Sequence, residues 1–137
     1  MMVDAATRAL VWGRAAGRCE YCQARQEDFD FFIFHVEHII PRCHGGSDDG
    51  ENLCLACPEC NAAKGTNLTG LLEGKIVPLF HPRRQAWSRH FRWEGMLLVG
   101  RTRAGAVTVD VLHINAPDRL AVRRNLIEEG RFPPTND

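Results

Sequence analysis

The segment VEHIIPRCHGGSDDGENLCLACPECNAAKG at residues 36–65, preceded by CEYC at residues 19–22, contains the residues from which the architecture of this chain can be worked out. Two C-x-x-C pairs, 34 residues apart, occur in these two segments: Cys19 and Cys22, then Cys57 and Cys60. Each pair can present two thiolates from a tight turn, and four thiolates complete a tetrahedral zinc site with no open position. The spacing therefore predicts a structural Zn²⁺ ion whose binding free energy stabilises the fold.

Two other interpretations of the cysteines are open, namely disulfides and a redox C-x-x-C. Disulfides are rare in reducing compartments, and the chain has neither a signal-peptide pattern nor an apolar run long enough to span a membrane. A cytoplasmic location without membrane contact is therefore expected. A redox motif would accompany a βαβ pattern, which the sequence does not show. Of the remaining cysteines, Cys54 lies in an apolar run and is expected to be buried, whereas Cys43 lies in a loop.

The residues around these cysteines carry clear signals for secondary structure. Residues 4–16 predict a helix with a cap at Asp4. Residues 31–40 (FFIFHVEHII) are apolar, aromatic or β-branched and predict a strand, and residues 42–52 have the glycine and aspartate content of a loop. A proline at the first position and a glycine at the end favour a helix over residues 58–64.

The same residues resemble the motif of the HNH nuclease family. In that family two C-x-x-C pairs accompany (D/E)-H-I-x-P, a Gly-Gly loop, N-L and C-x-x-C-N-x-x-K, and all of these occur here in order between residues 19 and 65. The resemblance implies a ββα-metal core, in which two short strands and a helix surround the site. It also implies an enzyme that hydrolyses phosphodiester bonds in nucleic acid, with double-stranded DNA as the expected substrate.

The resemblance further implies roles for individual side chains. His38 would be the general base that activates water, Glu37 and Asn61 would bind one catalytic Mg²⁺ or Mn²⁺, and Asn52 would pin the loop and help to orient His38. An imidazole titrates near neutral pH, and oxygen ligands suit hard cations. Two positions depart from the commonest form of the family motif: residue 37 is Glu where Asp is commoner, and residue 61 is Asn where His is commoner. Because adjacent strand residues point to opposite faces, the strand must bend for Glu37 and His38 to share a site. Lys64 could support phosphate charge, but a solvated position at the helix end is expected.

The C-terminal half predicts a small antiparallel β unit followed by a helix. Residues 66–74 predict a short helix or turn, and extended segments are expected at residues 75–80, 91–93, 96–102 and 106–114. A final helix should run from about residue 115 to 129, and Pro133 and Pro134 should begin an irregular tail.

Arginines dominate the basic residues of this half. Those interleaved with aromatic residues can follow a phosphate backbone while the rings stack on bases, although a surface over buried tryptophans is the alternative. With Lys64, the candidates for nucleic-acid binding are Arg83, Arg84 and Arg89. On the final helix, Arg119 and Arg123 are four residues apart and should form an exposed basic face above core contacts from Leu120, Val122, Leu126 and Ile127.

Composition sets the limits of these expectations. The 137 residues include 17 basic and 17 acidic side chains, so the net charge is zero, which argues against a strong non-specific coat on DNA. We expect an α+β chain with two parts: an HNH module with an N-terminal helix at residues 1–70, and a β-and-helix extension packed on it at residues 71–137. The sequence leaves the oligomeric state open. A non-catalytic zinc module that binds nucleic acid or a protein is the alternative function, but binding alone would not need the set of Glu37, His38, Asn52 and Asn61.

Overall fold

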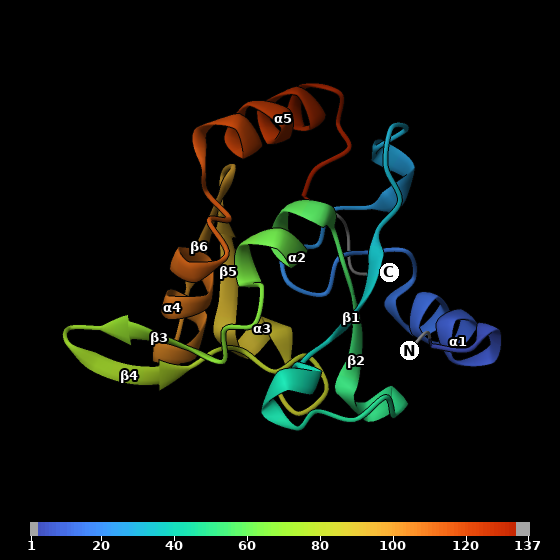
Figure 1. The fold of residues 1–137 in the computed structure, drawn as a ribbon. Helices are drawn as coiled ribbons and strands as arrows, with labels where there is room; N and C mark the ends of the chain where they lie inside the picture. The colour runs from blue at the N-terminus through green and yellow to red at the C-terminus, as the bar shows by residue number, and fades with distance from the viewer. Residues whose placement is uncertain (1–2, 134–137) are drawn as a thin grey trace.

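The computed structural model describes residues 3–133, and within this range the chain is an α+β fold, as predicted (Figure 1). The elements in chain order are α1 (Ala5–Ala15), β1 (His35–His38), β2 (Leu53–Ala56), α2 (Pro58–Lys64), β3 (Thr69–Leu72), β4 (Lys75–Pro78), α3 (Trp87–His90), β5 (Phe91–Glu94), β6 (Leu97–Gly100), α4 (Arg103–Val111) and α5 (Pro117–Glu128). The strands pair as three two-stranded antiparallel sheets. None of the helices in residues 3–133 combines the length and the apolarity that a membrane crossing requires.

The first sheet and the helix after it form the predicted ββα core. β1 pairs with β2 so that His38 lies opposite Leu53, and every residue of β2 is buried. α2 follows directly, and it has Pro58 in its first turn because a helix start does not need that missing N–H group. The Sγ atom of Cys57 accepts a hydrogen bond from the backbone N of Cys60 at 3.4 Å, so a cysteine caps this helix.

Helix α1 packs on this core through one buried valine and one arginine. Its start is capped by Asp4, whose Oδ1 accepts from the backbone N of Thr7 at 2.7 Å. Val11 is fully buried. The Nη2 atom of Arg14 donates to the carbonyl oxygens of Gly50 and Leu53, at 2.5 and 2.6 Å, and so ties the helix to the start of β2.

The second half of the chain builds two hairpins around α4, and α5 then returns to the core. β3 pairs with β4 and β5 with β6, and α4 packs against both hairpins. Figure 1 shows the β3–β4 hairpin projecting to one side, with α5 crossing above α2. The predicted β unit and final helix are therefore confirmed, with a second hairpin and α4 in addition.

Three predicted elements are wrong in extent or type. The strand expected at residues 31–40 is limited to His35–His38. Before it, the rings of Phe29, Phe32 and Phe34 contact one another. The side chain of Gln26 also donates to the carbonyl oxygen of Phe32 and accepts from the backbone N of Phe34, so this backbone bonds to a side chain and not to a strand. The short helix or turn expected at residues 66–74 is instead the lead into strand β3, the strand itself and, at residues 73–74, the turn between β3 and β4.

The strand expected at residues 106–114 is instead helix α4 and the turn after it. Thr102 caps this helix, since its Oγ1 accepts from the backbone N of Gly105 at 3.1 Å. Gly105 also lets the helix start lie directly on α3, where a Cβ atom would be 2.0 Å from the carbonyl oxygen of His90. Long-range packing has therefore overridden the β-branched composition. Of the irregular tail expected from Pro133 and Pro134 onward, residues 134–137 lie outside the described residues.

Candidate functional site

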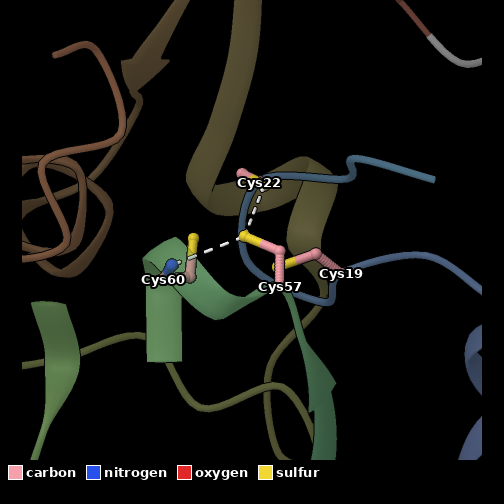
Figure 2. Close-up of side chains that lie close together, drawn as sticks. All are labelled: Cys19, Cys22, Cys57 and Cys60. Carbon is pink, nitrogen blue, oxygen red and sulfur yellow. Dashed lines mark hydrogen bonds between the residues drawn. The ribbon is translucent and has the colours of Figure 1, made fainter. Parts of the chain in front are cut away.

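The two C-x-x-C pairs meet in one buried cluster, as predicted. The four Sγ atoms, from Cys19, Cys22, Cys57 and Cys60, all lie within 4.8 Å of one another. Figure 2 shows one pair on the turn after α1 and the other at the start of α2. The sulfurs of Cys22 and Cys57 are 3.7 Å apart, far beyond the roughly 2.05 Å of a disulfide, and all six cysteines are free thiols. This geometry fits a closed tetrathiolate zinc site and excludes the disulfide alternative.

A buried arginine from α5 contacts this cluster. The Nη2 atom of Arg119 lies 3.1 Å from Sγ of Cys60 and 3.9 Å from Sγ of Cys57. Its Nη1 atom donates to the carbonyl oxygen of Leu112 at 3.0 Å. A zinc ion with four thiolates carries a net charge of −2, so a buried guanidinium here compensates part of that charge.

The exposed basic face predicted on the final helix is therefore wrong. Arg119 and Arg123 are both buried, whereas Val122 and Ile127, expected in the core, are exposed. Arg123 bonds to the carbonyl oxygens of Ile114 and Met96 and lies over the ring of Trp93. The helix turns Arg119 and Arg123 inward because carbonyl oxygens and thiol sulfurs that accept their hydrogen bonds lie beneath it. Of the four apolar residues expected in the core, Leu126 alone is buried and Leu120 is half-buried.

The candidate base, His38, belongs to a chain of three charged or polar groups at the end of β1. Its Nε2 atom lies 2.6 Å from Oδ1 of Asp48, and Arg42 contacts the same oxygen through Nε at 3.0 Å and Nη2 at 2.9 Å. Hydrogen bonds from His38 and Arg42 hold the pKa of Asp48 below its usual value. An ionised Asp48 makes Nε2 of His38 the protonated nitrogen, so Nδ1 is left to accept a proton.

The loop that carries Asp48 is held by the second candidate, Asn52. Its Oδ1 accepts from the backbone N of Ile40 at 2.9 Å, and its Nδ2 donates to the carbonyl oxygens of Ile40 at 2.9 Å and Ser47 at 2.8 Å. Gly46 is required in the same loop, because a Cβ atom there would lie 1.7 Å from the carbonyl oxygen of Ile40. Asn52 therefore lies where it can fix the loop whose Asp48 contacts His38.

Glu37 is turned the other way, into the protein. Its carboxylate is 3.8 Å from Nζ of Lys64 and 4.0 Å from Sγ of Cys54, which in turn contacts the hydroxyl of the buried Tyr21. Burial raises the pKa of Glu37 to about 7, and the charge of Lys64 opposes that rise. Lys64 is only 2% exposed, and its Nζ also donates to the carbonyl oxygen of His38 at 3.4 Å. The expectation of a solvated Lys64 is therefore wrong, whereas the buried Cys54 is confirmed.

Asn61, the other predicted metal ligand, lies on α2 three residues before Lys64 and is half-buried. Among residues 3–133 its side chain has no hydrogen-bond partner, in contrast to Asn52. Helix α2 packs on β1, so Asn61 and Glu37 come from neighbouring elements. Both offer oxygen atoms, which are the ligands that Mg²⁺ and Mn²⁺ prefer.

The arginines predicted to bind nucleic acid differ in their surroundings. Arg83 forms an ion pair with Glu20 and is largely covered, and burial lowers its pKa. Arg84 and Arg89 are exposed to solvent. The aromatic residues among them, Trp87 and Trp93, are half-buried and in ring contact with each other, so they form part of the packing of this half.

Two residues of the site were missed by sequence reasoning. Asp48 lies ten positions after His38 in a loop with two other acidic residues, and no local signal separates it from Asp49 or Glu51. Arg119 lies 59 residues beyond Cys60, where helical spacing indicates a face but not which face is buried. A buried arginine could be sought wherever a cluster of thiolates needs a counter-charge.

Comparisons with known proteins agree with this geometry. Residues 19–67 match the model of the HNH endonuclease family. The chain is 31% identical over 129 residues to the Septu protein PtuB of Bacillus thuringiensis, a match that covers 85% of this chain and 48% of that protein. It is also 25% identical over 142 residues to the Septu protein PtuA of Bacillus mycoides (strain KBAB4), with 82% of this chain and 20% of that protein covered. The chain thus spans less than half the length of either relative, and no solved structure matches it.

Proposed function

We propose that this chain, whose residues 19–67 match the HNH endonuclease family model, is an endonuclease that hydrolyses phosphodiester bonds with the help of a divalent ion. Double-stranded DNA is the proposed substrate. The observation that carries the proposal is the pairing of His38 with Asp48, at 2.6 Å, on the pair of strands that leads into the buried four-cysteine cluster. A module that only binds nucleic acid or a protein would not require an oriented imidazole.

In the proposed reaction His38 is the general base. Its Nε2–H is held by Asp48, so Nδ1 takes the proton from the attacking water. A positioned base contributes roughly 10²–10⁴-fold to a rate. Asn52 acts through the loop and not on the substrate, because its three hydrogen bonds fix the backbone between Ile40 and Ser47.

Two kinds of metal ion are proposed. Zn²⁺ on the four cysteines is structural, because all four positions of a tetrahedron are filled by protein ligands. Glu37 and Asn61 would hold Mg²⁺ or Mn²⁺, and their oxygen atoms fit that ion. When bound, such an ion neutralises charge on the phosphate oxygens and the departing oxygen. Since Glu37 is paired with Lys64, ion binding would exchange one positive neighbour for another.

Nucleic acid would be held by exposed arginines of the C-terminal half. Arg84 and Arg89 are free to contact phosphates, whereas Arg83 and Lys64 are already paired with Glu20 and Glu37. Guanidinium groups bind phosphate oxygens in a forked geometry. Of the four candidates, we therefore assign direct phosphate contacts to Arg84 and Arg89.

Supercoiled-plasmid cleavage tests the proposed function. Zinc-loaded protein would be incubated with plasmid in EDTA, Mg²⁺ or Mn²⁺, with His38→Ala beside the wild type. We expect nicking that requires the divalent ion and falls by about 10²–10⁴-fold in the variant, with zinc content unchanged. DNA binding without cleavage under every ion would favour the non-catalytic module, and wild-type rates in His38→Ala would show that the base is another residue.

A further inference from the structure

A cavity of about 440 Å³ lies where the ββα core meets the base of the β3–β4 hairpin. Its lining includes Ile39 and Ile40 from the core, Leu68 and Leu79 from the hairpin base, and His81 and Arg84 from the following loop. We call it the hairpin-base pocket. Its volume falls in the range of roughly 300–1,000 Å³ that is usual for pockets that bind small ligands. Neither half of the chain forms this pocket alone.

One side of the hairpin-base pocket is apolar and in contact with solvent. Ile39, Leu79 and Phe80 are buried behind it, but Leu68 is 39% exposed. A flat, apolar group could cover this surface and remove it from water. The area is small and concave, which suits one ring system better than a protein partner.

The polar side of the pocket consists of hydrogen-bond donors. Nδ1 of His81 accepts from the backbone N atoms of Arg83 and Arg84, at 3.2 Å each, so the ring proton is on Nε2. Burial, followed by the charge of Arg84, lowers the pKa of His81, which keeps this ring neutral. Oε1 of Gln85 accepts from the backbone N of His81 at 2.8 Å, so its amide group is left as a donor. A matching ligand therefore carries acceptors along one edge.

The pocket adjoins the candidate base. Ile39 and Ile40 follow His38 directly in the chain, and Lys64, which also lines the pocket, donates to the carbonyl oxygen of His38 at 3.4 Å. A strand with its phosphate at His38 therefore has its neighbouring nucleotide next to the pocket. The exposed guanidinium of Arg84 lies at the pocket, where it can meet the phosphate of that nucleotide.

We propose that the hairpin-base pocket receives one unstacked nucleobase of the strand that is cleaved, from the nucleotide beside the scissile phosphate. This inference rests on the proposed nuclease function. Leu68 and Leu79 cover the face of the base, and His81 and Gln85 donate to its acceptor edge. Because an unpaired base costs less to extrude than a paired one, substrates with a mismatch or an unpaired nucleotide at this position are preferred.

The pocket is tested with a blocking variant and a matched control on the same hairpin. Leu68→Trp places an indole at the pocket. Ile76→Trp makes the same kind of change at a position that is 73% exposed and outside the pocket lining. Zinc content and thermal unfolding would show that both variants keep the fold.

Cleavage by the wild type first maps the cut position. The probe is a duplex with 2-aminopurine beside that position. It is bound by His38→Ala protein, so that the strand stays intact. We expect its fluorescence to rise on binding, to rise equally with Ile76→Trp added, and to stay low with Leu68→Trp added. In parallel, the wild-type preference for an unpaired nucleotide at this position should be at least about tenfold and should be lost in Leu68→Trp alone.

The outcomes separate this inference from the proposed function. If the wild type cleaves but 2-aminopurine stays quenched in the bound duplex, the base pocket is wrong and the proposed nuclease function is unaffected. The same holds if Leu68→Trp does not change the fluorescence response. Failure of the wild type to cleave any of these duplexes overturns the proposed function, and the pocket's role in cleavage with it.

Discussion

The guanidinium of Arg119 lies 3.1 Å from the sulfur of Cys60, although the two residues are 59 positions apart in the chain. This contact links the last helix to the cysteine cluster at the start of α2. The final helix is thereby part of the surroundings of the cysteine cluster and not an appendage on the surface.

Arg119→Met should destabilise the zinc-loaded protein by about 3–5 kcal/mol, because the thiolate cluster would lose its buried counter-charge. Urea unfolding followed by tryptophan fluorescence, with zinc release measured by a chromogenic chelator, gives the free energy of unfolding. Arg124→Met is the control, since Arg124 is exposed on the same helix and its loss should change stability by less than about 0.5 kcal/mol. Zinc release from Arg119→Met at the wild-type urea concentration would contradict this role.

Removal of zinc should unfold the core. Cys60→Ser leaves three thiolates in a site built for four, so we expect less than stoichiometric zinc and loss of cooperative unfolding. Cys43→Ser is the matched control, because Cys43 is exposed and outside the cluster. Metal analysis and circular dichroism measure both effects. A Cys60→Ser protein with full zinc content and unchanged unfolding would mean that the cluster has another role.

Asp48→Asn should slow cleavage while the fold persists. The neutral amide no longer fixes the protonated nitrogen of His38, and we expect a loss of at least roughly ten- to hundredfold, the range found for partners that orient metal-binding histidines. Asp49→Asn removes a neighbouring exposed carboxylate and should leave the rate unchanged. Initial rates of cleavage are compared over a range of pH. The rate of Asp48→Asn should be lower, and its pH dependence should be shifted relative to the wild type. Equal rates for the two variants would remove Asp48 from the mechanism.

The buried Glu37 predicts a dependence of stability on pH. Its pKa is about 7 in the folded chain against an ordinary value of 4.5, so the folded state keeps a proton that the unfolded state releases. The free energy of unfolding of zinc-loaded protein, without Mg²⁺ or Mn²⁺, should therefore fall as the pH rises toward about 7 and then level off.

Glu37→Gln should abolish that part of the pH dependence, whereas Glu51→Gln, at an exposed position, should retain it. Urea unfolding between about pH 5.5 and 8, with zinc content checked at each point, makes the measurement. The same slope in wild type and Glu37→Gln would assign the titration to another group.

Local signals predicted the core of this fold, and long-range contacts decided the rest. Helix α2 begins and ends where its proline and glycine predict, because caps act within a few residues. The cysteine cluster followed from spacing alone. Helix α4 was missed, since the close approach of Gly105 to His90 is a tertiary contact that outweighs the β-branched residues of this segment. Lys64 shows the same limit: a lysine at a helix end is usually solvated, but Glu37 lies beneath this one.

The contacts between the two halves have a practical consequence for anyone who wishes to truncate or label the protein. A fragment that ends near residue 70 would lack Arg119, which contacts the cysteine sulfurs. It would also lack Trp87, whose indole N–H donates to the carbonyl oxygen of Tyr21 at 2.8 Å. Such a fragment would leave its metal ligands open to water and electrophiles. The exposed Glu73–Gly74 turn, at the tip of the projecting hairpin, is by contrast a place where a fluorophore or an affinity tag could be inserted without disturbing those ligands (Figure 1).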